Sequence, residues 1–266
     1  MSTWRFGDLE LVVLWEQFTG EGLPDPFIFT SRTPLLFDYL REKRAVAEQL
    51  RARQDPSLRW LAEVVTQPDL RITVSGFDCR DPENAEGRIR MIALRRADRG
   101  LLIKQLPGET YLHSGGFVVS ECDPLRLADE VAAALPEVEA GKQAEIELVD
   151  PRRNAVSESE IGRTIIDDVF EDSAGLRSKR FLMTTPVRMG TIQIGQGHSK
   201  FGPQGITRYG LEWRDLDGDG RYLIGGEPPY RAVAVDGAKF TRAINVRVAA
   251  VIRAIKDERG MLGVSE

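Results

Sequence analysis

The sequence holds few of the residues that build disulfide frameworks, metal centres and membrane spans. Cys79 and Cys122 are its two cysteines, which make neither a disulfide framework nor a zinc site. His113 and His198 are its two histidines, and neither stands in a metal-ligand pattern. No apolar run approaches the ~20 residues that span a bilayer, and no signal pattern opens the chain. We therefore expect a cytoplasmic protein without membrane insertion, metal or cofactor.

An excess of positive charge is also absent. The 266 residues carry a formal net charge of −5, so the basic footprint of a nucleic-acid-binding protein is missing. Apolar residues make up 42% and charged residues 29%, which is an ordinary globular balance. This length suits one large domain or two small ones. We expect a monomer or a weak homodimer.

The stretch Gly205–Gly260 has the clearest organisation. Residues 206–214 alternate between apolar and charged side chains, which predicts a half-buried strand. Residues 215–220 are dense in turn formers, and short strands are expected on the far side of that turn. Asp236 is placed to cap a helix that ends near Gly260. Its apolar stripe comprises Phe240, Ile244, Val248, Val251 and Ile255.

A similar arrangement occurs near the middle of the chain. Residues 117–120 predict a short strand, and Asp123-Pro124 opens a helix with proline at its first position. The strand-then-capped-helix pattern therefore occurs twice. We interpret the chain as a single domain, 1–266, built from two related halves, about 1–136 and about 143–266.

The remaining segments predict helices at the beginning, middle and end, with antiparallel strands between them. Helices are expected from Asp8, from Thr33-Pro34 and from Asp55-Pro56. Strands are expected at 70–75, 88–95, 101–106, 110–113, 143–149 and 187–194. Ser157 and Glu160 have capping-box spacing before another helix, while 172–180 reads as a polar segment. The fold class is α+β, with helices packed against one sheet.

Two loops resemble ligand-binding motifs, but each departs from its pattern. Asp215, Asp217 and Asp219 match the first positions of a calcium-binding EF-hand loop, although Gly226 stands where a bidentate glutamate is required. Gly195-Gln196-Gly197 is followed by neither the third glycine of a dinucleotide fingerprint nor a P-loop lysine at the right place. A hairpin turn and a sheet-edge loop are the favoured interpretations, and a calcium-stabilised module stays open.

The histidines leave an enzyme as the alternative. No nucleophile elbow accompanies His113 or His198, but a catalytic triad can assemble from residues distant in sequence. A small hydrolase with a site near either histidine is therefore the second hypothesis.

Short motifs in a fixed order make the chain similar to the EspG family, cytosolic chaperones of type VII (ESX) secretion. The resemblance covers nearly the whole chain. Its early motifs are Leu14-Trp15-Glu16, Gly22-Leu23-Pro24, Ser31-Arg32-Thr33, Leu58–Pro68 and Leu70–Gly76. Its late motifs are Gly195-Gln196-Gly197, Trp213-Arg214-Asp215, Gly220-Arg221-Tyr222-Leu223 and the helix after Asp236.

The resemblance implies a central antiparallel sheet flanked by two helical subdomains, with pseudo-twofold symmetry. It also implies a binding protein without catalytic activity. Its partner would be the PPE tip of a PE–PPE heterodimer, held by the sheet, the C-terminal helical part and a loop matching Arg80–Gly87. We expect apolar anchors among Tyr209, Leu211 and Trp213, for which core packing is the alternative. A polar rim would comprise Arg80, Asp81, Glu83, Asn84 and Glu86.

Overall fold

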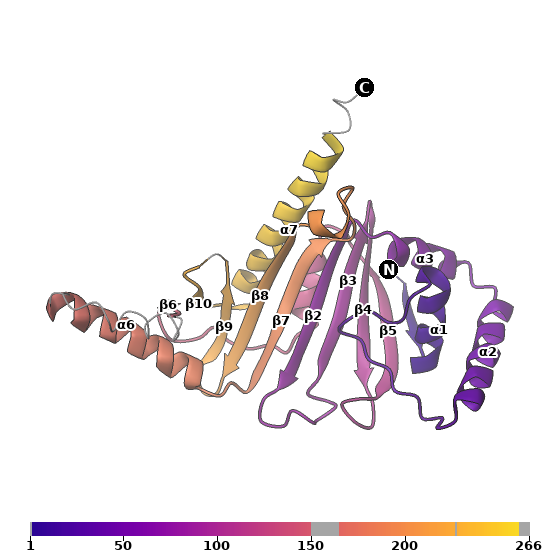
Figure 1. Ribbon diagram of the computed structural model, residues 1–266, viewed down its shortest axis with the longest axis horizontal. Helices are drawn as coiled ribbons and strands as arrows, with labels where there is room; N and C mark the ends of the chain where they lie inside the picture. Colours follow the sequence, from indigo (N-terminus) through magenta and orange to yellow (C-terminus); the bar gives the residue numbers. More distant parts are fainter. Residues whose placement is uncertain (1, 150–164, 227, 261–266) are drawn as a thin grey trace.

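One antiparallel sheet runs through the whole molecule (Figure 1). The computed structural model describes residues 2–149, 165–226 and 228–260. The strand order is β1-β5-β4-β3-β2-β7-β8-β9-β10-β6. The strands are β1 Thr3–Phe6, β2 Leu70–Asp78, β3 Ile89–Arg96, β4 Arg99–Pro107, β5 Ser114–Cys122, β6 Ile146–Glu147, β7 Arg188–Gln196, β8 Arg208–Leu216, β9 Gly220–Gly225 and β10 Arg231–Ala234.

Along the chain, helices lie before, between and after the two runs of consecutive strands, β2 to β5 and β7 to β10. The helices are α1 Asp8–Thr19, α2 Leu36–Ala52, α3 Ser57–Thr66, α4 Leu127–Ala133, α6 Ile165–Met183 and α7 Gly237–Gly260, with a 3-10 turn at Pro203–Gly205. In Figure 1, α1, α2 and α3 lie at one end of the sheet and α6 at the other, while α7 extends beyond its edge. None of the helices in the described ranges is long and apolar enough to cross a membrane. The α+β prediction is confirmed.

The element order repeats across the centre of the sheet. A helix, four antiparallel strands and a second helix occur as α3, β2 to β5, α4, and again as α6, β7 to β10, α7. β1 pairs with the outer strand of the first run and β6 with the outer strand of the second. β2 and β7 pair along their whole nine-residue length, so the two runs share one sheet. This repetition agrees with the expected pseudo-symmetry; the domain boundaries stay a prediction.

Three apolar clusters fill the spaces between the sheet and its helices. The largest lies between the middle strands and helices α4 and α7. The second joins α1, α2 and α3 to β3, β4 and β5 on the other side of the sheet. The third, around Phe181 and Tyr222, joins α6 to β9 and β10. Because the second and third clusters lie under α1 to α3 and under α6, helices cover both ends of one sheet face.

The predicted start of α7 is confirmed in detail. The backbone N–H of Lys239 donates to the Asp236 carboxylate over 2.7 Å, which satisfies a helix N-terminal donor. Val235 before the cap and Phe240 after it lie in the same core. Phe240, Ile244 and Val251 are buried, so the predicted stripe faces the sheet.

Several predicted segments differ from the structure. Residues 110–113 form a turn, because the Thr110 carbonyl accepts the His113 N–H, and β5 begins only at Ser114. The segment 172–180 is helical within α6. Its Ser178 is buried, and the Ser178 hydroxyl accepts a hydrogen bond from the Val149 N–H. The strand expected at 143–149 is confined to β6. The capping box at Ser157 and Glu160 lies outside the described residues.

Candidate interaction surface

The two faces of the middle strands differ in chemistry. Along β2, Leu70, Ile72 and Val74 are fully buried against the cluster that contains α4 and α7. Arg71 and Thr73 alternate with them and point to the opposite face. Directly paired residues of antiparallel strands lie on the same face of the sheet. The polar residues of β2 are therefore continued by their partners in β7 and β8. One face is a core and the other is polar.

Helices leave the middle of the polar face uncovered. The second cluster places α1 to α3 over one end of this face, and the third places α6 over the other. Between them, no helix of the described chain packs on β2, β7 and β8 from this side. We call this region the open face; its side chains are those of Arg71, Thr73, Ser75, Thr191, Gln193, Gly195, Arg208, Gly210 and Glu212.

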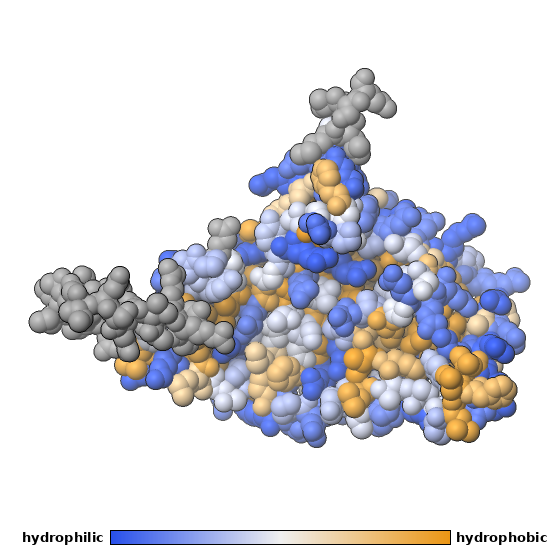
Figure 2. Space-filling view, viewed as in Figure 1, coloured by the Kyte–Doolittle hydropathy of each residue, from blue (hydrophilic) through white to orange (hydrophobic). Residues whose placement is uncertain are grey.

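Arginines dominate the charge of the open face. Arg71 and Arg208 stand on either side of Gly195 in one row across β2, β7 and β8. Arg90 is placed opposite Ser75 on β3, and its guanidinium donates to the Tyr111 carbonyl over 2.9 Å. Glu212 supplies a carboxylate, which Arg214 holds at 2.8 Å. Figure 2 shows hydrophilic and near-neutral residues over the middle of the sheet, with apolar patches among them. This surface is therefore basic on an acidic chain.

A cleft of about 300 Å³ opens at one end of the open face. Its wall opposite the sheet is the chain segment around Pro24 and Asp25, and its floor includes Arg71, Thr73 and Gln193. The Nε of Arg71 is buried and has no hydrogen-bond partner among the described residues. Removal from water lowers the pKa of Arg71, and the Glu21 carboxylate opposes that shift. The cleft thus holds a cation that is partly removed from water.

Aromatic rings surround a second arginine at the opposite end of the open face. The guanidinium carbon of Arg88 lies 5.3 Å from the Phe77 ring centre and 5.1 Å from that of Tyr111. Arg88 also donates to the Pro82 carbonyl, which ties it to the β2–β3 loop. Cation–π contacts of this kind are attractive because the faces of the rings are electron-rich, so they fix the position of Arg88.

The predicted rim residues lie on the β2–β3 loop, residues 79–88. Arg80, Asp81, Glu83, Asn84 and Glu86 are all exposed. Side chains hold the loop in tight turns, because the Asp78 carboxylate accepts the Arg80 N–H and the Asn84 amide oxygen accepts the Glu86 N–H. Arg80 reaches Asp217 of the β8–β9 turn over 3.1 Å. The loop is accessible beside the open face, and its role stays a prediction.

Two of the three predicted anchors belong to the core. Trp213 is 0% exposed and packs edge-to-face on Phe240 of α7, with ring centres 6.4 Å apart. Leu211 is 3% exposed in the same cluster. Tyr209 is 39% exposed, but its register opposite Ile194 puts it on the α7 side of the sheet. Leu211 and Trp213 as surface anchors are therefore wrong: their strand positions face α7.

The acidic turn is organised by protein partners. Asp215 is buried and receives two hydrogen bonds from Arg221, of 2.7 and 2.9 Å. Asp219 accepts hydrogen bonds from the Tyr222 hydroxyl and from the Lys142 and Gln143 segment. In the described ranges, no group of three acidic, histidine or cysteine side chains is arranged to hold a metal ion. The geometry supports the hairpin turn, because these carboxylates are directed to different protein partners.

The histidines do not share a site. His113 lies between β4 and β5, where its Nδ1 is 2.7 Å from the Thr110 hydroxyl. Ser114 next to it is turned to the backbone of Gly116. His198 is exposed just after β7, at the opposite end of the strands. Neither imidazole is hydrogen-bonded to a serine or an aspartate in the described structure, which removes the geometric support for the hydrolase hypothesis.

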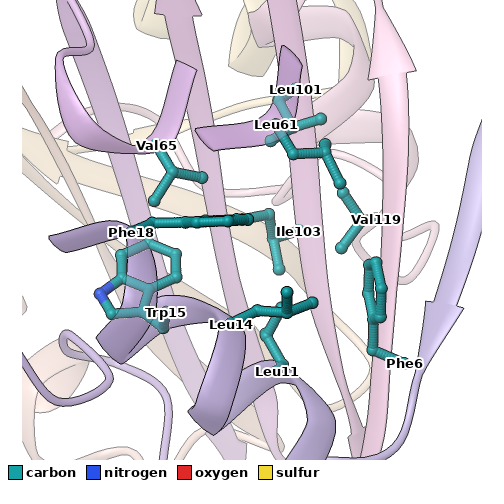
Figure 3. Close-up of a pocket in the computed structure, with 10 residues that line it drawn as sticks. All are labelled: Phe6, Leu11, Leu14, Trp15, Phe18, Leu61, Val65, Leu101, Ile103 and Val119. Carbon is teal, nitrogen blue, oxygen red and sulfur yellow. The ribbon is translucent and has the colours of Figure 1, made fainter. Parts of the chain in front are cut away.

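An apolar cavity inside the N-terminal core also offers no ligand site. Its volume is about 10 Å³, about that of a single water probe. Figure 3 shows its lining, which includes Leu14, Trp15 and Phe18 of α1 and Ile103 of β4, with no polar group converging on the space. The cavity is a small packing defect.

The glycine-rich segment permits close backbone packing. A Cβ on Gly197 would lie 1.9 Å from the Pro68 carbonyl oxygen, and the Gly197 N–H donates to Asp69 over 3.0 Å. Gly195 and Gln196 belong to β7. The expected loop at the edge of the sheet is therefore wrong for these residues, because β7 is a central strand. Gly197, just after β7, serves close approach.

Sequence reasoning did not identify the arginines of the open face. The signal was present, because Arg71, Thr73 and Ser75 alternate with a fully apolar set in β2. Alternation alone predicts a solvent-facing side and does not reveal which part of that side helices cover.

The chain belongs to the EspG family, whose model matches residues 8–245. Among solved structures, it is similar to the type VII secretion system chaperone EspG5 of Mycobacterium tuberculosis, determined in complex with a PE25–PPE41 dimer. The TM-score is 0.50 at 9% sequence identity, over 97% of this chain and 96% of EspG5, so this likeness is one of fold. No curated protein matches the chain.

Proposed function

We propose that this protein is a cytoplasmic chaperone of type VII secretion. It binds the PPE tip of a PE–PPE-type heterodimer, keeps that substrate soluble and delivers it to the secretion machinery. It acts by binding and not by catalysis. Membership of the EspG family carries the proposal, since the EspG5 chaperone has the same fold and was determined with a PE25–PPE41 dimer.

The open face supports the proposal as the binding surface. A chaperone needs a preformed surface large enough to cover a partner's exposed tip. Here a sheet face lies between helical subdomains, with the exposed β2–β3 loop along its edge. In this arrangement the open face receives the tip, and Arg80, Asp81, Glu83, Asn84 and Glu86 form the polar rim. Tyr209, the one exposed aromatic of the three expected anchors, lies on the α7 side of the sheet and is not part of this surface.

Co-expression with PE–PPE pairs tests the proposal. Each pair encoded in the source genome is produced with the chain, and complexes are sized by chromatography with light scattering. We expect a stable complex of stoichiometric mass with at least one pair. Absence of a complex with every pair, while the chain is folded, would refute the substrate class.

Two bulky substitutions locate the surface. No atom lies within 4 Å of a Cβ placed on Gly210, so Gly210→Trp is expected to fold and to fill the open face. Ala133 is an exposed residue of α4, the helix that packs on the covered face, so it lies on the other side of the sheet from the open face. Ala133→Trp is the matched control. We expect loss of the complex with the first variant and its retention with the second.

A further inference from the structure

We propose that the cleft at Arg71 recognises a carboxylate carried by the partner. The inference rests on the proposed function for the identity of that partner, a PE–PPE-type heterodimer. It specifies which group the open face recognises. This group is an acidic side chain on the tip, which enters between the sheet and the segment around Pro24.

Arg71 has no carboxylate in ion-pair contact within the described ranges. Its Nε is buried without a hydrogen-bond partner, and neither Arg71 nor Arg208 takes part in any of the ion pairs formed by the described residues. A partly desolvated guanidinium without a paired carboxylate is costly, because some of its hydration is lost and no pairing replaces it. Among possible ligand groups, a carboxylate therefore gives this site the largest favourable change in interaction free energy.

The geometry around Arg71 leaves room for that carboxylate. Gly195 has no side chain and stands between Arg71 and Arg208 in the same row, and both arginines line the cleft. The Arg208 side chain leans over Gly195, because its Cγ would lie 3.1 Å from a Cβ placed there, so the carboxylate enters beside this row and not above Gly195. Thr73 and Gln193 supply further hydrogen-bonding groups on the floor of the cleft. Guanidinium groups bind carboxylates through paired N–H donors, which gives direction as well as charge.

The cleft's own carboxylates do not fill this position. Asp25 lines the wall, and Glu21 acts on Arg71 only through its charge, with no ion pair recorded from either residue to Arg71. The cleft therefore combines a mildly acidic wall with a cationic floor. This arrangement favours a carboxylate that reaches the floor over one that remains at the entrance.

Binding measurements on Arg71 variants test the inference. Arg71→Gln is expected to weaken the complex with the co-purified PE–PPE pair about 30-fold or more, as when one member of a buried ion pair is removed. Its melting temperature should stay level or rise, because a part-buried charge without an ion pair is removed. Arg71→Lys should bind with intermediate affinity, since an ammonium keeps the charge without the paired donors.

Arg126→Gln is the matched control, because Arg126 is an exposed arginine on the connection into α4. It should change the affinity less than twofold, about the scatter expected for a remote surface charge. Equal affinities for wild type and Arg71→Gln would overturn the inference, as would an equal loss in Arg126→Gln.

A second measurement needs no PE–PPE pair. Acetylated triglutamate and triglutamine amides are titrated into the isotope-labelled chain alone, and the Arg71 Nε–H and Gly195 amide signals are followed by NMR. We expect saturable shifts with the glutamate peptide only, absent in Arg71→Gln. Such shifts without any PE–PPE complex would refute the proposed function and retain carboxylate recognition. Absence of shifts would overturn the inference.

Discussion

The covered and open faces of the middle strands are made by alternate residues of the same segments. In β2, Leu70, Ile72 and Val74 enter a core with no contact to water, whereas Arg71, Thr73 and Ser75 stay at the surface. The covered face stabilises the fold against α4 and α7. This leaves the open face free to carry charge and glycine, so one sheet can be a scaffold on one face while the other face stays available for the binding role that we propose.

The largest expected loss comes from truncating the covered face at Trp213. Trp213→Ala removes a fully buried indole and should lower the free energy of unfolding by about 4 kcal/mol. Tyr209→Ala is the control on the same strand, and its effect should be well below half as large because Tyr209 is part-exposed. Urea denaturation measures both. A stable Trp213→Ala protein that has lost only partner binding would contradict the core assignment.

Breaking the buried ion pair beneath the acidic turn should have the next largest effect. Asp215→Ala leaves Arg221 buried without its carboxylate and should cost about 3 kcal/mol. Asp217→Ala in the same turn should cost little, because that side chain is 84% exposed and its pair with Arg80 lies at the surface. Thermal and urea unfolding of the two variants provide the comparison. Stabilisation of the wild type by calcium would contradict our account of the turn.

Two glycines on neighbouring strands sharpen the difference between the faces. A Cβ on Gly190 would lie 2.2 Å from the Trp213 ring and 2.4 Å from the Ser75 carbonyl, so Gly190→Ala should destabilise by about 2 kcal/mol. Gly210 faces open space, and Gly210→Ala should change stability by about 0.5 kcal/mol or less. Similar losses in both variants, measured by urea denaturation, would show that the faces are equally packed.

The smallest effect concerns the segment that walls the cleft. Arg32 holds this segment through two hydrogen bonds to Glu109, of 2.8 and 2.7 Å, and these lower the pKa of Glu109 from 4.5 to about 2. Because the folded pKa is depressed, this stabilisation is complete above pH 4.5 and disappears as the pH falls toward 2. NMR titration should show the Glu109 pKa returning toward its usual value in Arg32→Gln. An unchanged midpoint would show that Arg32 is not the cause.

Local rules predicted the elements whose signals are local. The cap at Asp236, the stripe on α7 and the alternation in β2 follow from spacing along the chain. The roles of Trp213 and Asp215 depend on which helix covers which side of the sheet. That arrangement is set by tertiary packing, so the sequence predicted the strand of Trp213 and left its burial undecided.

The candidate site was predictable only in part for the same reason. The β2–β3 loop is polar and short in the sequence and exposed in the structure. Arg71 resembles any solvent-facing strand residue until the neighbouring strands and the segment around Pro24 enclose it. Long-range pairing of β2 with β7 creates the cleft, and no short motif records that pairing.

Site-specific photo-crosslinking tests the central claim that the open face binds the partner. A photoreactive amino acid replaces Thr191 on the open face or Ala133 on α4, and each variant is illuminated with the PE–PPE pair that co-purifies. Our account predicts a crosslink to the PPE subunit from position 191 and none from position 133. A crosslink from position 133 alone would contradict it and move the binding surface to the covered side.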